Sequence, residues 1–372
     1  MPRTPLESLI AQRISEEGPL TFREFMELAL YHPQWGYYAS SSQRIGKEGD
    51  FFTSVSVGSL FGRLLARQIG EMLGVVEPPL TVVEMGAGEG HLARDVVEGL
   101  LGMGRRSFTY GIVERSPAMR ERQRQILEGI SLVVWAESVG DLAPFRGVVF
   151  SNELVDSFPV HLVEMTEAGL QEVYVDLEDG RLVERLLEPS TPELEGYFGE
   201  LGVDLPVGFR TEVNLEALGW IQEVAASLEQ GFLVTIDYGY PSHELYQPYR
   251  SRGTLMAYRG HRSSEDLLDS PGEQDLTSHV NFSALKHWGE KAGLTTLGFT
   301  DQSHFLLSLG ILDVVSGGGN EPDTKEILRA KTLIMPGGMG DTFKVLVQAK
   351  GVDPSWVPTG LREVPNRASY RL

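Results

Sequence analysis

The strongest chemical signal in the sequence is a glycine-rich loop that follows a run of β-branched residues. Residues 84–90 read Glu-Met-Gly-Ala-Gly-Glu-Gly, directly after the apolar stretch 80–83. Glycines between the end of a strand and the start of a helix let a ligand approach the backbone closely. We therefore expect Gly86, Gly88 and Gly90 to contribute to a cofactor-binding site.

An acidic residue at the start of this loop indicates which cofactor it would hold. The dinucleotide fingerprint is Gly-x-Gly-x-x-Gly or Ala, whereas His91 takes the sixth place here. Glu84 puts a carboxylate beside the loop, where it would repel a pyrophosphate and attract an amino-acid ammonium group. S-adenosylmethionine carries that ammonium and has no phosphate, so the pattern favours S-adenosylmethionine over NAD.

Acidic residues also follow the next two expected strands. Glu114 ends the run 108–114, at the place where a carboxylate would accept hydrogen bonds from both ribose hydroxyls. The alternative is that Glu114 is an exposed carboxylate at the start of a helix, because Ser116 and a proline follow it. Glu137 comes after the third strand and would accept from an adenine amine, with the backbone of Ser138 nearby.

A polar group follows the fourth expected strand, 147–150. Asn152, Glu153 and Asp156 lie there. Because ligands of open α/β sheets bind off the carboxyl ends of the strands, we expect these side chains to face the same cavity as the glycine loop. The alternative is an ordinary helix cap by Ser151 or Asn152.

The elements that must position these residues alternate between strand and helix. Helical spacing covers 60–73, 91–101 and 117–128, between strands at 80–84, 108–114, 131–135 and 147–150. This βαβ order predicts a mostly parallel sheet with helices on both faces. Alternating polar and apolar residues predict inserted antiparallel strands over 160–187. After this insertion, the sequence predicts helices at 215–228 and 282–292 and strands at 231–237, 294–299 and 342–349. Two short helices are expected within 5–31, with Thr21 and Glu24 forming a capping box.

Composition excludes several other functions. The 372 residues carry 32 basic and 52 acidic side chains, a net charge of −20, which disfavours binding to nucleic acid. There is no cysteine and the eight histidines are scattered, so no metal site is expected; His261 and His279 have no assigned role. No apolar run approaches the roughly 18 residues that span a bilayer, and no secretory signal is seen. These features predict a cytoplasmic protein that does not bind membranes.

Stretches spread over nearly the whole chain resemble the MidA family of S-adenosylmethionine-dependent methyltransferases, which includes an arginine methyltransferase of mitochondrial complex I assembly. The most specific are residues 152–161, which begin Asn-Glu-Leu-Val-Asp, and residues 271–280, which end Asp-Leu-Thr-Ser-His-Val. The others are 29–38, 49–54, 84–90, 237–239 and 253–258. Two places depart from the family: Val55 and Ser56 replace a usual Pro-Glu, and Asn281 stands where Asp is frequent.

The resemblance implies a Rossmann-like α/β fold with a seven-stranded class I methyltransferase sheet, whose last strand is antiparallel. It further implies an N-terminal helical cap and lid loop over residues 1–60 and a methyltransferase core over 61–372. Insertions near 160–215 and 241–281 would form the lid and the substrate segments. Gly49, Asp50 and Thr53 would close over the cofactor.

The function implied is methyl transfer from S-adenosylmethionine to an arginine of a protein. Because a guanidinium keeps its charge at neutral pH, carboxylates must orient it and share its proton as it attacks. Glu153 and Asp156 are the expected catalytic residues, with Asn152 orienting them and also touching the cofactor. The expected partner is a protein with a basic segment, for example a subunit of the respiratory complex I type, and the chain would act as a monomer or homodimer. Two alternatives stay open: methylation of a small molecule or another residue, and a non-catalytic assembly factor using the same cleft.

Overall fold

The structure, a computed structural model, describes residues 4–39, 57–260, 262–316, 323–362 and 372. The chain forms two compact units, each built from three separate stretches of sequence. Unit 1 comprises Met1–Phe51, Asp156–Gly219 and Tyr240–Ala284, and unit 2 comprises Phe52–Val155, Trp220–Gly239 and Leu285–Leu372.

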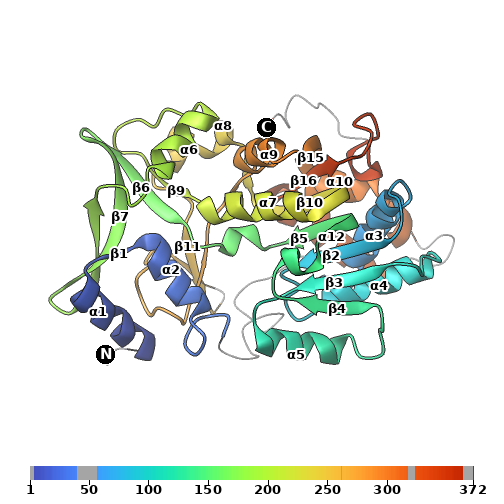
Figure 1. The fold of residues 1–372 in the computed structure, drawn as a ribbon, viewed down its shortest axis with the longest axis horizontal. Helices are drawn as coiled ribbons and strands as arrows, with labels where there is room; N and C mark the ends of the chain where they lie inside the picture. The colour runs from blue at the N-terminus through green and yellow to red at the C-terminus, as the bar shows by residue number, and fades with distance from the viewer. Residues whose placement is uncertain (1–3, 40–56, 261, 317–322, 363–371) are drawn as a thin grey trace. The chain divides into compact units, whose positions relative to one another are not determined.

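The path of the main sheet has seven strands in the order β15-β16-β10-β5-β2-β3-β4, and these strands lie in unit 2 except for Tyr240 at the end of β10 (Figure 1). Strands β10, β5, β2, β3 and β4 are parallel to one another, whereas β16 is antiparallel to both β10 and β15. The strands are β2 (Leu80–Met85), β3 (Thr109–Val113), β4 (Val133–Ala136), β5 (Phe145–Asn152), β10 (Leu228–Tyr240), β15 (Thr295–Asp301) and β16 (Phe343–Lys350). The expected βαβ order and the antiparallel last strand are therefore confirmed.

This sheet differs from the expected one in its number of strands. It contains eight strands, because the two-residue strand β14 (Val280–Asn281) lies off the path of seven. The segment Val148–Phe150 of β5 and the segment Phe232–Val234 of β10 are completely buried, as expected for parallel strands covered on both faces. The helices of this part of the chain are α3 (Leu60–Leu73), α4 (His91–Gly102), α5 (Pro117–Ile126), α7 (Leu215–Ser227), α9 (Phe282–Lys291), α10 (Gln302–Ser308), α11 (Ile311–Val315), α12 (Thr324–Ile334) and α13 (Met339–Thr342).

Unit 1 contains two antiparallel sheets. One has the order β1-β7-β6-β9 with β8 paired to β7, and the other has the order β12-β11-β13. The strands are β1 (Leu20–Thr21), β6 (His161–Thr166), β7 (Gly169–Glu178), β8 (Arg181–Leu187), β9 (Arg210–Val213), β11 (Met256–Arg259), β12 (Arg262–Ser264) and β13 (Asp275–Thr277). The helices are α1 (Pro5–Glu17), α2 (Phe22–Tyr31), α6 (Glu193–Leu201) and α8 (Ser242–Leu245). The antiparallel strands expected over 160–187 are thus confirmed.

One hydrophobic core joins the three stretches of unit 1. Phe25 and Met26 of α2, Val173 of β7 and Leu276 of β13 are all buried in it. The predicted domain boundary at residue 60 divides the chain into two continuous stretches. This core instead joins the N-terminal helices to strands from both expected insertions. Because each short stretch has too little apolar surface to fold alone, the stretches are stable only together.

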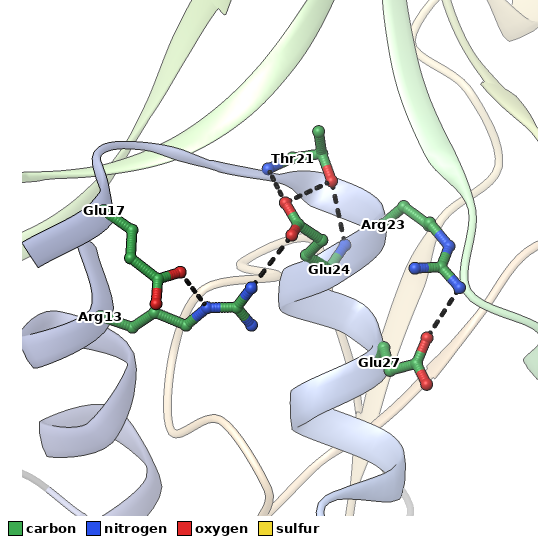
Figure 2. Close-up of polar contacts among 6 residues, drawn as sticks. All are labelled: Arg13, Glu17, Thr21, Arg23, Glu24 and Glu27. Atoms are coloured by element: carbon green, nitrogen blue, oxygen red, sulfur yellow. Dashed lines mark hydrogen bonds and ion pairs between the residues drawn. The ribbon is translucent and has the colours of Figure 1, made fainter. Parts of the chain in front are cut away.

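The start of α2 has the local structure that its sequence predicts. The Thr21 hydroxyl accepts from the Glu24 backbone N–H at 3.2 Å, and a Glu24 carboxylate oxygen accepts from the Thr21 N–H at 3.0 Å (Figure 2). This confirms the expected capping box. Arg13 of α1 contacts the Glu24 carboxylate at 3.2 Å and the Glu17 carboxylate at 2.9 Å, so it connects the two helices.

Two regions hold structure that periodicity did not predict. Periodicity assigned no helix or strand to the segment 240–280, which contains α8 and strands β11 to β13. Residues 302–342 contain helices α10 to α13, with 317–322 outside the described residues. Strands of three or four residues have too few positions to show an alternating pattern. Within the described part of the chain, no helix is long and apolar enough to cross a membrane.

Candidate functional site

The glycine loop leads from β2 into α4, as expected. Gly86, Gly88 and Gly90 all have positive φ angles, of 71°, 52° and 95°. A Cβ atom on Gly86 would lie 2.7 Å from Cδ1 of Leu154, whereas a Cβ on Gly88 would meet no atom of the described residues within 4 Å. Gly86 is therefore required for close packing. Gly88 is the glycine that leaves open space beside the backbone, which is what a bound ligand needs.

The Glu84 side chain is more buried than its position beside the glycine loop suggested. Its side chain is 2% exposed, and a carboxylate oxygen accepts a hydrogen bond from the Tyr110 hydroxyl of β3 at 2.6 Å. Burial raises the pKa of Glu84 to about 7, although the hydrogen bond from Tyr110 lowers it. The carboxyl group is thus part of the contact between β2 and β3, and near neutral pH it is only partly charged.

Glu114 follows β3 and is held in a fixed orientation. Its Oε1 accepts from the Ser116 N–H at 2.8 Å, and its Oε2 accepts from Nε2 of Gln123 at 3.2 Å. Ser116 also caps α5, because its hydroxyl accepts from the Met119 N–H. Burial raises the pKa of Glu114, and the hydrogen bonds from Ser116 and Gln123 lower it. An ionised carboxylate has further lone pairs, so it can still accept from a diol.

The groups expected to bind adenine already have partners in the protein. The Glu137 carboxylate is 75% exposed and pairs with Arg120 at 2.9 Å. The Ser138 N–H donates to Oδ2 of Asp141 at 2.9 Å, and the Glu137 N–H donates to the same atom at 3.1 Å. An adenine ring at this place would have to share or displace these contacts.

Glu153 has an unusual backbone conformation immediately after β5. Its φ angle is 54°, a left-handed value that is uncommon for residues other than glycine and is frequent at functional sites. Asp237, three residues before the end of β10, holds the turn, because its Oδ2 accepts from the N–H groups of Leu154 and Val155 at 3.2 and 2.9 Å. The Glu153 side chain accepts from Nδ2 of Asn152 at 3.0 Å.

Asp156 belongs to unit 1, although it lies only three residues after Glu153. There it is part of a tyrosine–carboxylate group consisting of Tyr31, Tyr38, Tyr258, Asp156 and Asp275. The Tyr38 hydroxyl donates to Asp275 at 2.9 Å, and the Tyr31 and Tyr38 rings lie 5.3 Å apart. Burial raises the pKa of Tyr38 well above its ordinary value, and the charges of Asp275 and Asp156 raise it further. Both carboxylates thus act on the same buried hydroxyl.

Several expected residues cannot be placed. Gly49, Asp50, Thr53 and His261 lie outside the described residues. His279 is half-buried, and desolvation lowers its pKa to about 4, so it is neutral at physiological pH. In the described ranges, no group of three or more His, Asp or Glu side chains is arranged to hold a metal ion.

Two residues matter to this geometry and received no role from the sequence. Gln123 lies under the glycine loop, where its Nε2 donates to the Gly88 carbonyl at 2.8 Å. Asp237 holds the Glu153 turn, as described above. Asp237 had a signal, because it ends a strand in the same way as Asn152. Gln123 had none, since a single glutamine on a charged helix is ordinary.

The residues of unit 2 fit S-adenosylmethionine. Oδ1 of Asn152 is buried and accepts no hydrogen bond from any residue that the structure describes, so it can accept one from an ammonium group. Gly88 leaves open space and Glu114 offers a fixed carboxylate. Because an unmade buried hydrogen bond is costly, the Asn152 acceptor favours a ligand with a donor at this position.

Known proteins resemble this chain over most of its length. Protein arginine methyltransferase NDUFAF7, mitochondrial, from Danio rerio is 27% identical over 374 residues, covering 90% of this chain and 84% of the relative. The human protein of that name is also 27% identical, covering 92% of this chain and 82% of its own length. A solved structure from Burkholderia thailandensis, bound to S-adenosyl-homocysteine, is 34% identical with a TM-score of 0.87, covering 96% of this chain and 94% of that one.

A family model gives the assignment directly. The model described as "Putative S-adenosyl-L-methionine-dependent methyltransferase" matches residues 64–300, which include the glycine loop, Glu114 and Glu153. The expected cofactor and the expected class of enzyme are both confirmed by these comparisons. This chain belongs to that family of S-adenosylmethionine-dependent methyltransferases.

Proposed function

We propose that this chain transfers the methyl group of S-adenosylmethionine to an arginine side chain of a protein. The relatives named protein arginine methyltransferase support this substrate class. The observation that carries the proposal is Glu153, a carboxylate held on a left-handed backbone at the end of β5. Strain of this kind persists only where surrounding contacts enforce it, here those of Asp237.

The tyrosine–carboxylate group of unit 1 supplies a second line of support. Carboxylates bind a guanidinium through paired hydrogen bonds, and aromatic faces attract its charge. Asp156 and Asp275 provide the carboxylates, and Tyr31 and Tyr38 provide neighbouring rings. A net charge of −20 also suits a substrate segment rich in basic residues.

The residues have separate roles in this proposal. S-adenosylmethionine supplies a methyl group activated by the sulfonium to which it is bonded. Asn152 and Glu114 hold the amino-acid and ribose parts of the cofactor. Glu153 and Asp156 orient the guanidinium and accept its proton, because a charged guanidinium has no free lone pair for attack. Catalysis of this kind rests mainly on positioning in a site from which water is excluded.

The test compares wild type with Glu153→Gln, which keeps the shape of the side chain and removes its charge. Each protein is incubated with S-adenosylmethionine and a lysate from cells that lack this protein, and methyl-arginine is sought by mass spectrometry. We expect methyl-arginine with wild type, a strong loss with the variant, and nearly unchanged calorimetric affinity for S-adenosyl-homocysteine. Glu128→Gln, at an exposed position after α5, serves as the control.

Other outcomes would favour the alternatives. Methylation of a small molecule, or of a residue other than arginine, would replace the proposed substrate class. Binding of S-adenosyl-homocysteine without transfer to any protein would favour a non-catalytic assembly role. Loss of cofactor affinity in Glu153→Gln would move Glu153 into the cofactor site.

The finer description of the fold is part of the same proposal. We propose that the seven strands on the path are a class I methyltransferase sheet to which β14 is an addition. The N-terminal helices would act as a cap, and the stretches near 160–215 and 241–281 as lid and substrate segments. We further propose that the protein is cytoplasmic, that its partner is a protein with a basic segment, and that it acts as a monomer or homodimer. A mitochondrial location is part of the relatives' names.

A further inference from the structure

Gln123 is a buried amide on a helix whose sequence is mostly polar and charged. Helix α5 buries only Met119 and Gln123, and the Gln123 side chain is 0% exposed. A buried amide is costly unless its donors and its acceptor are bonded. The contacts of Gln123 therefore show what this position is for.

The Gln123 amide connects the ends of three neighbouring strands. Its Nε2 donates to the Gly88 carbonyl after β2 at 2.8 Å and to Oε2 of Glu114 after β3 at 3.2 Å. Its Oε1 accepts from Nε1 of Trp135 in β4 at 3.0 Å. A glutamine is suited to this place because it offers two donors and an acceptor on one planar group.

Packing holds the amide close to the loop. A Cβ atom on Gly90 would lie 3.4 Å from both Cα and Cγ of Gln123. This is van der Waals contact distance, so α5 packs directly against the loop at Gly90. The other Glu114 oxygen is bonded by the Ser116 N–H at the start of the same helix, so α5 fixes both oxygens of this carboxylate.

We propose that Gln123 is a positioning residue, which orients the Glu114 carboxylate toward the ribose hydroxyls of the cofactor. This rests on the ribose role of Glu114, and not on arginine being the substrate. Gln123 does not touch the cofactor itself. Its effect should therefore depend on whether the ligand has ribose hydroxyls for Glu114 to bind.

The experiment measures calorimetric affinity for two ligands, S-adenosyl-homocysteine and its 2′,3′-dideoxy analogue. Gln123→Met keeps the length of the side chain and removes all three hydrogen bonds. We expect it to weaken S-adenosyl-homocysteine about tenfold, equivalent to about 1.4 kcal/mol, and to weaken the analogue less than about threefold. A general loosening of the site would weaken both ligands equally.

Matched variants keep the test decisive. Gln125→Met changes an exposed glutamine of the same helix and should leave both affinities unchanged. Trp135→Phe removes the bond to Oε1 of Gln123 and also shortens the ring that lies 5.3 Å from the Arg124 guanidinium. It should show the same preference between the two ligands to a smaller degree, even if Gln123→Met fails to fold. Melting curves without ligand identify variants that are not folded.

Glu114→Gln separates the two parts of the inference. If Glu114 binds ribose, this variant also loses affinity for S-adenosyl-homocysteine and not for the analogue, and adding Gln123→Met to it has little further effect. If Glu114→Gln weakens both ligands equally or neither, the ribose role is wrong and the proposal fails with it. If Glu114→Gln discriminates but Gln123→Met and Trp135→Phe do not, the positioning role alone is overturned.

Discussion

Replacing Glu153 by glycine and by alanine separates the charge of this side chain from the strain of its backbone. Both changes delete the carboxylate, but only glycine accepts a φ of 54° without penalty. The left-handed conformation costs an L-residue about 1–2 kcal/mol. Glycine in turn loses about 0.5–1 kcal/mol more backbone entropy on folding. The difference between the midpoints of these two ranges predicts that Glu153→Gly is more stable than Glu153→Ala by about 0.75 kcal/mol.

The surrounding contacts keep the turn in place in both variants. The Glu153 N–H donates to the Ile236 carbonyl at 3.0 Å, and Asp237 accepts from the next two N–H groups. None of these bonds involves the Glu153 side chain. Alanine therefore cannot relax to a right-handed conformation without breaking them, and the strain stays in the folded state.

Urea unfolding and methyl transfer test the two effects separately. We expect Glu153→Gly to have a larger free energy of unfolding than Glu153→Ala. Both variants should show a strong loss of methyl transfer. Affinity for S-adenosyl-homocysteine should remain close to that of wild type and shows that each variant is folded. An alanine variant as stable as the glycine variant would refute the strain argument. Transfer within about twofold of wild type would refute the role of the carboxylate.

Three further predictions concern other parts of the chain. Gly88→Val should abolish calorimetric binding of S-adenosyl-homocysteine, because the new side chain fills the open space beside the loop at a φ of 52°; measurable binding would place the cofactor elsewhere. Burial raises the pKa of Glu84 to about 7, so the folded state favours the protonated carboxyl. The free energy of unfolding of wild type should therefore fall, relative to that of Glu84→Gln, as the pH rises from about 5 to about 8. A difference between the two proteins that does not change with pH would contradict this prediction. Asn281→Asp should lower the melting temperature, because Nδ2 of Asn281 donates to the Tyr197 and Tyr246 hydroxyls at 2.9 and 3.1 Å and a buried carboxylate cannot donate. An unchanged melting temperature would contradict this and would show that the two hydroxyls donate to the carboxylate instead.

Local chemistry could be predicted from the sequence alone. The capping box of α2, the strand before the glycine loop and the helix after it all depend on residues within a few positions of one another. The carboxyl ends of successive parallel strands also share one edge of the sheet. The order of elements therefore predicted that Glu114, which follows β3, and Asn152, which ends β5, lie at the same edge.

The tertiary structure decided what those residues are bonded to. Glu84 and Tyr110 are 26 positions apart, and Gln123 contacts Gly88 across 35; no local pattern encodes such pairs. The same holds for the core of unit 1, where α2 and β13 meet although they are far apart in the chain. Periodicity reports which face of an element is apolar, but not which element covers that face, because that depends on the packing of the whole chain.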